Sequence, residues 1–250
     1  MVVVYKLIFF IKRQKGQEWV VCILIVIPAY NEAGNIERVV DNLIANYPQY
    51  DYVVVNDGSK DSTATICKQR NFNLIDLPVN LGLAGAFQTG IKYAYENGYD
   101  AAIQLDGDGQ HNPIYIQPML DKLQETKADI VIGSRFVNKK KPQGLRMLGS
   151  RIISFAIWVT THKKITDPTS GFRLFNRSVL NEFANRLNYG PEPDTVSYLL
   201  GNGAVVEEVQ VEMKERVAGK SYLTATKAMQ YMVRMVSSII LIQSVRKRET

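Results

Sequence analysis

Ala101-Ala102-Ile103-Gln104-Leu105-Asp106-Gly107-Asp108-Gly109-Gln110-His111 is a mainly apolar run that leads directly into a polar, glycine-rich segment. Similar apolar runs occur at residues 20–27, 52–55, 73–77 and 129–133. Such runs are typical of strands buried in a sheet, and segments with helical spacing separate them. Because strands alternate with helices, we predict an α/β fold whose mostly parallel sheet is flanked by helices on both faces.

A polar segment with glycine or proline lies near the end of each predicted strand. These segments are residues 28–32, 56–59, 80–82, 106–111 and 133–135. In open α/β sheets, ligands bind at the carboxyl ends of the strands. We therefore expect these loops to converge on one rim of the sheet and to form the functional site there.

The second half of the chain predicts two more strands and two amphipathic helices. Residues 167–175 predict a loop that enters a strand, and residues 204–211 predict another strand. After Pro142, apolar residues recur every three or four positions, which predicts a helix that carries Arg146 and Ser150 on another face. Its apolar positions are Leu145, Leu148, Ile152, Phe155 and Val159.

A last helix is predicted at about residues 223–243 and is followed by Arg246-Lys247-Arg248. Its apolar stripe consists of Met229, Met232, Val233, Val236, Ile239 and Ile240. We expect an N-terminal extension over residues 1–18, one domain over 19–222 and an amphipathic, basic helix over 223–250.

Composition excludes several classes of protein. The chain has 30 Lys and Arg against 24 Asp and Glu, a net charge of +6, with 46% hydrophobic residues, which is typical of a folded protein. Cys22 and Cys67 are too few for a disulfide framework, and two histidines are too few for a zinc site of the usual kind. No uncharged stretch reaches the roughly 20 apolar residues that span a bilayer, so we predict no transmembrane helix.

Asp106 and Asp108 are two residues apart after a buried strand, so both carboxylates can point to the same side of an extended chain. Mg²⁺ and Mn²⁺ prefer oxygen ligands and often combine one or two carboxylates with substrate phosphates. Gly107 and Gly109 would allow the backbone to approach a diphosphate closely. The alternative is a simple tight turn, and we expect His111 to be a rim or packing residue rather than a ligand.

Asp57 follows the second strand and could accept the imide proton of uracil or of a similar base. A turn at Asp57-Gly58 is the alternative, and Asp61 or Ser62 is expected to cap the next helix. Phosphate chemistry also needs cations, and Arg135, Arg146, Arg216 and Lys220 lie near predicted loop or helix ends. Arg146 and Ser150 form an i, i+4 pair that suits an oxyanion.

Six motifs in this order give the chain a specific resemblance. They are Ile27-Pro28-Ala29-Tyr30-Asn31-Glu32, Asn56-Asp57-Gly58-Ser59-Lys60-Asp61, Leu105 to His111, Gly133-Ser134-Arg135, Ser170-Gly171-Phe172-Arg173, and Glu215-Arg216 through Gly219-Lys220-Ser221. Over about residues 23–223 the chain resembles inverting family 2 glycosyltransferases with the Rossmann-like GT-A fold. The resemblance points to the branch of dolichyl-phosphate mannose synthases and bacterial polyprenyl-phosphate glycosyltransferases.

The resemblance implies a role for each matching residue. Pro28, Tyr30, Glu32, Asp57 and Asp106 would bind the nucleotide, whereas Asp106, Asp108 and Gln110 would hold Mg²⁺ or Mn²⁺ and the diphosphate. Arg135, Arg146 and Ser150 would bind the donor and acceptor phosphates, and Arg216 and Lys220 belong to a loop that closes over the diphosphate. Asp106, Asp108, Arg135 and Arg146 are the expected catalytic residues.

The expected reaction is metal-dependent, inverting transfer of a sugar from a UDP- or GDP-linked donor to polyprenyl phosphate, for cell-envelope glycan synthesis. A lipid phosphate is already ionised and needs no strong base, whereas a sugar hydroxyl does. Asp167, Glu192 and Asp194 are the candidate bases, although each could equally be a helix cap or a solvated acid, which is the favoured interpretation for Glu192 and Asp194. Transfer to a saccharide hydroxyl, or a non-catalytic nucleotide-sugar-binding module, are the alternative functions. The Gln-x-x-Arg-Trp motif of processive synthases does not occur in the sequence.

The last helix and its basic end suit an anionic membrane surface, although packing against its own domain or a second subunit is an equal alternative. We expect a peripheral protein at the cytoplasmic face of the cell membrane. A homo-oligomer or a small membrane-protein partner is compatible with this. No nucleic-acid-binding module is recognised, so nucleic acid is not an expected partner.

Overall fold

The structure is a computed structural model that describes residues 21–186, 190–213 and 225–243, with the side chains of 145–146, 225–228 and 242–243 left out. The strands are β1 (Ile23–Ala29), β2 (Asp51–Asp57), β3 (Leu74–Leu77), β4 (Ala101–Gln104), β5 (Ile130–Ser134), β6 (Arg173–Asn176) and β7 (Val206–Gln210). The helices are α2 (Ile36–Asn46), α3 (Thr63–Gln69), α4 (Gly82–Glu96), α5 (Ile116–Thr126), α6 (Leu145–Thr161), α7 (Arg177–Asn185), α8 (Pro193–Gly201) and α9 (Ala225–Ser237). A 3₁₀ turn, η1 (Pro113–Tyr115), precedes α5, and a π-helical turn, η2 (Ser238–Gln243), continues α9.

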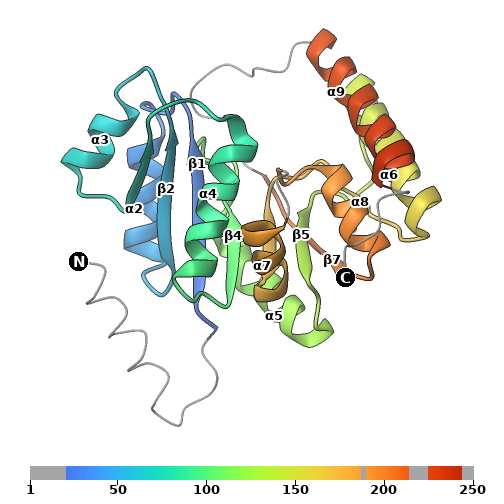
Figure 1. Cartoon of the computed structure of the whole chain (residues 1–250), viewed down its shortest axis with the longest axis horizontal. Coiled ribbons are helices and arrows are strands. Elements are labelled where there is room, and N and C mark those ends of the chain that lie inside the picture. Colours follow the sequence, from blue (N-terminus) through green and yellow to red (C-terminus); the bar gives the residue numbers. More distant parts are fainter. Residues whose placement is uncertain (1–20, 187–189, 214–224, 244–250) are drawn as a thin grey trace.

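The seven strands form one sheet in the order β3-β2-β1-β4-β6-β5-β7, which crosses the centre of Figure 1. Every neighbouring pair is parallel except those of β6, which runs antiparallel to both β4 and β5. The predicted α/β class and mostly parallel sheet are confirmed, although the strand limits differ by up to three residues at β1.

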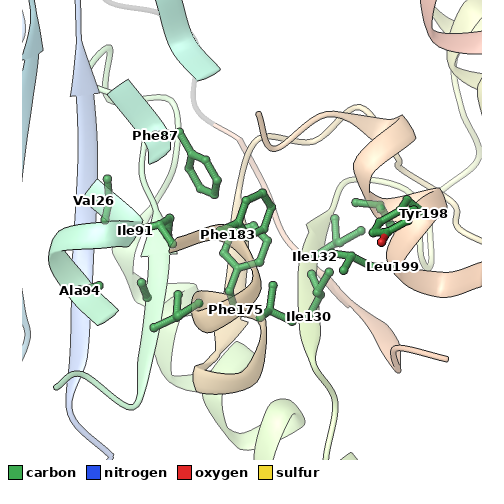
Figure 2. Close-up of a cluster of buried hydrophobic side chains, with 14 of the residues drawn as sticks. Val26, Phe87, Ile91, Ala94, Ile130, Ile132, Phe175, Phe183, Tyr198 and Leu199 are labelled. Carbon is green, nitrogen blue, oxygen red and sulfur yellow. The ribbon is translucent and has the colours of Figure 1, made fainter. Parts of the chain in front are cut away.

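Alternating side chains of the strands supply two separate hydrophobic cores. In β1, Ile23, Ile25 and Ile27 pack with α2, α3 and α5, whereas Leu24 and Val26 pack with α4, α6, α7 and α8. Phe87, Phe175 and Phe183 meet edge to face in the second core, with ring centroids 5.2–5.6 Å apart (Figure 2). Because both faces of the sheet are covered, its ends are left to bind ligands.

The apolar stripe predicted on α6 faces outward. Leu148, Ile152, Phe155 and Val159 are exposed, together with Trp158. The face that packs on the protein is formed by Gly149, Ile153, Ala156 and Ile157.

The small residue Gly149 explains why α6 buries this other face. A Cβ at Gly149 would lie 1.7 Å from the sulfur of Met232, so glycine is what allows α9 to approach α6. The stripe predicted on the last helix is likewise divided, because Ile239 is buried whereas Met229, Val233 and Ile240 are exposed. Periodicity therefore located both helices and the apolar stripe of α6, but it did not show which side of α6 packs on the protein.

Candidate active site

A cavity of about 360 Å³ lies beyond the carboxyl ends of β1, β2 and β4. It is lined by Pro28, Ala29, Tyr30, Glu32, Asp57, Asn80, Gly82, Leu83, Ala86, Asp106, Gly107 and Asp108. Four of the five polar segments predicted to converge contribute to it, and the fifth, residues 133–135, does not. The predicted nucleotide residues and the two predicted metal carboxylates thus line one cavity.

Asp106 is oriented by side chains from its own strand and loop. Gln104 Nε2 donates to Asp106 Oδ1 at 3.0 Å, and the backbone N–H of Asp106 donates to His111 Nδ1 at 3.1 Å. Because Nδ1 accepts, the neutral imidazole carries its proton on Nε2, which lies 3.6 Å from Asp106 Oδ2. His111 is buried and stacks on Phe172, so its imidazole faces Asp106 from a fixed position.

Asp108 is buried, and its Oδ1 accepts a hydrogen bond of 3.0 Å from the backbone N–H of Gln110. The side chain of Gln110 is not among the residues that line the cavity, so its role as a metal ligand stays a prediction. Gly107 lies close to the first loop, because a Cβ there would be 3.2 Å from the carbonyl oxygen of Pro28.

The residues present fit a divalent cation whose coordination a substrate completes. Asp106 and Asp108 line the same cavity, and hard cations are commonly held by two carboxylates together with phosphate oxygens and water. No group of three or more His, Cys, Asp or Glu side chains placed to hold a metal occurs in the described part of the chain. The carboxylate pair therefore suits Mg²⁺ or Mn²⁺ bound together with a diphosphate.

Asp57 is almost fully buried and is held by the loop after β3. Its Oδ1 accepts a hydrogen bond of 2.7 Å from the backbone N–H of Leu81, and its carbonyl accepts one of 3.0 Å from Asn80 Nδ2. Gly58 has φ of +60°, and a Cβ there would lie 2.6 Å from the carbonyl carbon of Val79. Glycine is therefore required where the two loops meet to place Asp57 in the cavity.

Arg135 lies away from this cavity in an ion pair with Asp167. Its Nε and a terminal nitrogen donate to the two carboxylate oxygens at 2.7 and 2.8 Å. Asp167 is fully buried, which opposes its charge, but the hydrogen bonds and charge of Arg135 outweigh burial and lower its pKa. A role for Arg135 at the donor diphosphate stays a prediction.

Among the other predicted phosphate residues, Ser150 is the one whose side chain the structure describes. Ser150 is buried on α6, where its Oγ accepts a hydrogen bond of 2.9 Å from Lys141 Nζ. The side chain of Arg146, and all of Arg216 and Lys220, lie outside the described part of the structure, as do residues 1–18 and 246–248.

All three candidate bases are engaged by other groups. Asp167 is paired with Arg135, and Glu192 Oε2 accepts a hydrogen bond from the hydroxyl group of Tyr231. Asp194 is buried and accepts from Ser238 Oγ at 2.7 Å and from the backbone N–H of Thr195 at 2.9 Å. None of the three lines the cavity that holds Asp106 and Asp108.

Sequence reasoning missed three side chains at these sites. Gln104 and His111 orient Asp106, and Lys141 contacts Ser150. The position of His111 within the motif after β4 was the one available signal, whereas Gln104 and Lys141 had none.

The fold is that of GT-A glycosyltransferases. The chain is similar to glucosyl-3-phosphoglycerate synthase from Mycobacterium tuberculosis, with a TM-score of 0.68 at 15% identity over 93% of this chain and 87% of the other. It is also similar to the mannosyltransferase PcManGT from Pyrobaculum calidifontis in complex with GDP-Man and Mn²⁺, with a TM-score of 0.56 at 15% identity over 97% of this chain and 79% of that one.

The chain belongs to glycosyl transferase family 2, whose family model matches residues 24–183. Its relatives include the UDP-N-acetylglucosamine–dolichyl-phosphate N-acetylglucosaminyltransferase of Methanococcus voltae, 35% identical over 66% of this chain and 73% of that protein. The polyprenol monophosphomannose synthase of Mycolicibacterium smegmatis is 28% identical over 81% of both chains. The undecaprenyl-phosphate mannosyltransferase of Micrococcus luteus is 26% identical over 81% of this chain and 87% of its own. The protein is therefore a glycosyltransferase, as its sequence predicted.

Proposed function

We propose that this enzyme transfers a sugar from a UDP- or GDP-linked donor to polyprenyl phosphate, with inversion at the anomeric carbon. The observation that carries the proposal is the common cavity of Asp57, Asp106 and Asp108, which brings the carboxylate proposed to bind the base close to the pair proposed to hold the metal. The printed names of three relatives, which refer to dolichyl phosphate, polyprenol and undecaprenyl phosphate, support the class of acceptor.

Asp106 and Asp108 would hold the divalent ion together with the donor diphosphate. Mn²⁺ occurs with UDP or GDP-Man in the similar solved structures, which supports a divalent cofactor. When bound, such an ion supplies Lewis-acid neutralisation of the negative charge that develops on the leaving diphosphate. Asp57 would accept a hydrogen bond from a ring N–H of the base, and Pro28, Tyr30 and Glu32 would enclose the nucleoside.

The engaged candidate bases favour a phosphate acceptor over a saccharide hydroxyl. A hydroxyl must lose its proton during attack, and the carboxylates of Asp167, Glu192 and Asp194 are already occupied by Arg135, Tyr231 and Ser238. A phosphate monoester is ionised near neutral pH and needs cations that orient it rather than a base. Arg146, Arg216 and Lys220 remain candidates for that role, together with Arg135.

A lipid acceptor also requires that the enzyme reach a membrane. None of the helices among residues 21–186, 190–213 and 225–243 is long and apolar enough to cross one. The outward faces of α6 and α9 instead carry large apolar side chains, such as Phe155 at 63% exposure and Val233 at 60%. We propose that these helices rest on the cytoplasmic face of the membrane where the acceptor lies.

The function is tested by incubating labelled nucleotide sugars with polyprenyl phosphate and Mg²⁺ or Mn²⁺, and extracting the product into organic solvent. We expect lipid-soluble label, its loss on chelation, and transfer at least about a hundredfold slower in Asp108→Asn with the thermal unfolding temperature unchanged. Asp121→Asn, an exposed aspartate on α5, is the matched control.

Three other results would contradict the proposal. Unchanged turnover in Asp108→Asn would remove the metal assignment, and a product that stays in water would point to a saccharide acceptor. Donor binding without release of nucleoside diphosphate in any lipid extract would point to a binding module.

A further inference from the structure

A second cavity, of about 250 Å³, lies beside α6 and is strongly cationic. It is lined by Phe136, Lys139, Lys141, Arg151, Ser154, Lys164, Ile165 and Thr166. None of these described lining residues is acidic, although Lys139 Nζ is paired with the exposed Glu212 at 2.6 Å. Lys141, Arg151 and Lys164 thus bring positive charge to a cavity that no function has yet used.

Lys141 is the central group of this cavity. Its Nζ donates to Ser150 Oγ at 2.9 Å and to Ser154 Oγ at 3.3 Å, and it lies 5.7 Å from the ring centroid of Phe136. Burial lowers the pKa of Lys141, while the charges of Asp167 and Glu208 act in the opposite direction. The ammonium is therefore partly desolvated among neutral hydroxyls, which is unfavourable until an anion joins it.

The carboxylates that act on Lys141 at longer range have other partners. Asp167 is paired with Arg135, and Glu208 accepts from the backbone N–H groups of Thr166 and Asp167 and from Thr166 Oγ1. Arg151 donates to the carbonyl of Lys141 at 3.0 Å, which fixes the loop that carries the lysine without neutralising either charge. The cavity is thus built to receive an anion from outside.

The exposed apolar stripe of α6 borders this cavity directly. Residues four apart are neighbours on a helix surface, so Phe155 follows Arg151 and Trp158 follows Ser154. Both aromatic side chains are exposed, at 63% and 49%, and their rings lie 5.8 Å apart. A ligand with a phosphate and an apolar chain could therefore engage the cations and the stripe at the same time.

The cavity is also connected to the region of Asp106. The guanidinium of Arg135 lies 5.1 Å from the ring centroid of Phe136, and Lys141 Nζ lies 5.7 Å from the same centroid. Arg135 is in turn paired with Asp167. Four residues after Asp167, a Cβ at Gly171 would lie 3.5 Å from Asp106 Oδ2. These contacts, together with the short segment from Asp167 to Gly171, connect the cationic cavity to Asp106 of the proposed metal site.

We propose that Lys141, with Arg151, Lys164 and the hydroxyls of Ser150 and Ser154, forms the subsite that binds the phosphate monoester of the lipid acceptor, while the α6 stripe holds its hydrocarbon chain. This inference rests on the proposed function for the identity of the acceptor. It adds a binding role for Lys141, Arg151, Lys164 and Ser154, which the sequence motifs do not include.

The test measures lipid binding separately from transfer. In a Trp19→Phe background, Trp158 is the one remaining tryptophan, and its fluorescence reports binding of farnesyl phosphate or neutral farnesol in detergent. We expect farnesyl phosphate to bind about ten- to a hundredfold more tightly than farnesol, and Lys141→Met to remove this preference. The KM for polyprenyl phosphate should rise by a similar factor, while the affinity for nucleoside diphosphate with Mn²⁺ stays unchanged.

Lys140→Met is the matched control, because Lys140 is exposed and does not line the cavity. Lys141→Arg keeps the charge and should restore most of the preference, which separates loss of charge from misfolding. Equal binding of farnesyl phosphate and farnesol by the wild type, or a preserved preference in Lys141→Met, would overturn the inference. If inorganic phosphate bound as tightly as farnesyl phosphate, the inference that the ligand is a lipid phosphate would be rejected.

These outcomes distinguish the subsite from the proposed function. A Lys141-dependent preference for farnesyl phosphate without any sugar transfer would keep the subsite and reject the activity. Transfer to polyprenyl phosphate that is unaffected in Lys141→Met would keep the activity and reject the subsite.

Discussion

The position of the Asp106 carboxylate is fixed by two neighbouring side chains, Gln104 and His111. Gln104 donates to one of its oxygens, and His111 accepts from its backbone and faces the other oxygen. Groups that hydrogen-bond a ligating carboxylate fix its orientation and tune its affinity for metal. His111 is therefore a packing residue, one of the two roles expected from its place in the sequence, and in this structure it also positions Asp106.

We predict that His111→Phe weakens binding of Mn²⁺ in the presence of UDP by about ten- to a hundredfold. Phenylalanine keeps the ring stacked on Phe172 but removes both nitrogens that face Asp106. Calorimetric titration of Mn²⁺ measures the change independently of sugar transfer. His162→Asn is the control, because His162 is exposed and its left-handed backbone suits asparagine. Equal Mn²⁺ affinity in His111→Phe and wild type would remove this role.

The residues of the site were predictable where a sequence motif lies at the end of a strand. The cavity residues Pro28, Tyr30, Asp57, Asp106 and Asp108 lie at or just beyond the carboxyl ends of three neighbouring strands, so strand order alone brings them together. The pairing of Arg135 with Asp167 was not predictable, because it joins residues from separate loops through packing. The role of Lys141 was not predictable for the same reason, since it depends on contacts with Ser150 and Ser154 of α6.

Two buried charged side chains, Asp167 at the start of the loop before β6 and Arg173 at its end, hold this loop in place. Asp167 is fully buried in its pair with Arg135, whose side chain is 22% exposed. The fully buried Arg173 donates to the carbonyls of Pro168, Ser170 and Pro191. These contacts fix the segment that carries Gly171 next to Asp106, so the loop links the stability of the fold to the site.

We predict that Asp167→Asn lowers the free energy of unfolding by about 3 kcal/mol at pH 7, because it leaves the mostly buried Arg135 without its counter-charge. Since Arg135 lowers the pKa of Asp167 in the folded state, this stabilisation is complete above the unfolded value of about 4 and is lost as the pH falls through the folded value. Urea unfolding at several pH values measures both effects.

The control for this pair is the exposed pair of Arg70 with Asp41, whose side chains are 46% and 42% exposed. Asp41→Asn should change the free energy of unfolding by less than about 1 kcal/mol. An acid dependence in Asp167→Asn that matches the wild type would show that another carboxylate governs stability in that range.

Element types were predictable from periodicity, but their partners were not. The run entering β6 indicated a strand, yet its antiparallel place between β4 and β5 depends on a long return of the chain through α6. The apolar stripe of α6 is present, but another side of the helix is buried, where the absence of a side chain at Gly149 allows α9 to pack closely. A 3.6-residue period reveals an apolar face without saying whether protein or lipid covers it.

At the scale of the whole molecule, the apolar stripe and the two cavities suit an enzyme that works at an interface. Figure 1 shows α6 and α9 side by side at one end of the sheet, away from α2 and α3. Their exposed apolar side chains include Leu148, Phe155, Trp158 and Val233, and Leu241 of η2 is exposed as well. Arg151 lies beside this stripe on α6, and Arg234 of α9 is also exposed, so cations accompany the apolar surface.

We predict that the protein sediments with phosphatidylcholine vesicles containing phosphatidylglycerol, and that Phe155→Ser with Trp158→Ser lowers the partition coefficient at least about tenfold, because each large apolar side chain contributes about 1.5–3 kcal/mol when buried. Higher salt should also weaken binding, since cations near an anionic surface are screened. Ile114→Ser, which alters an exposed apolar side chain in η1, should leave sedimentation unchanged. If the double variant instead binds vesicles like the wild type but changes from a dimer to a monomer in analytical ultracentrifugation, the α6 surface contacts a second copy rather than lipid.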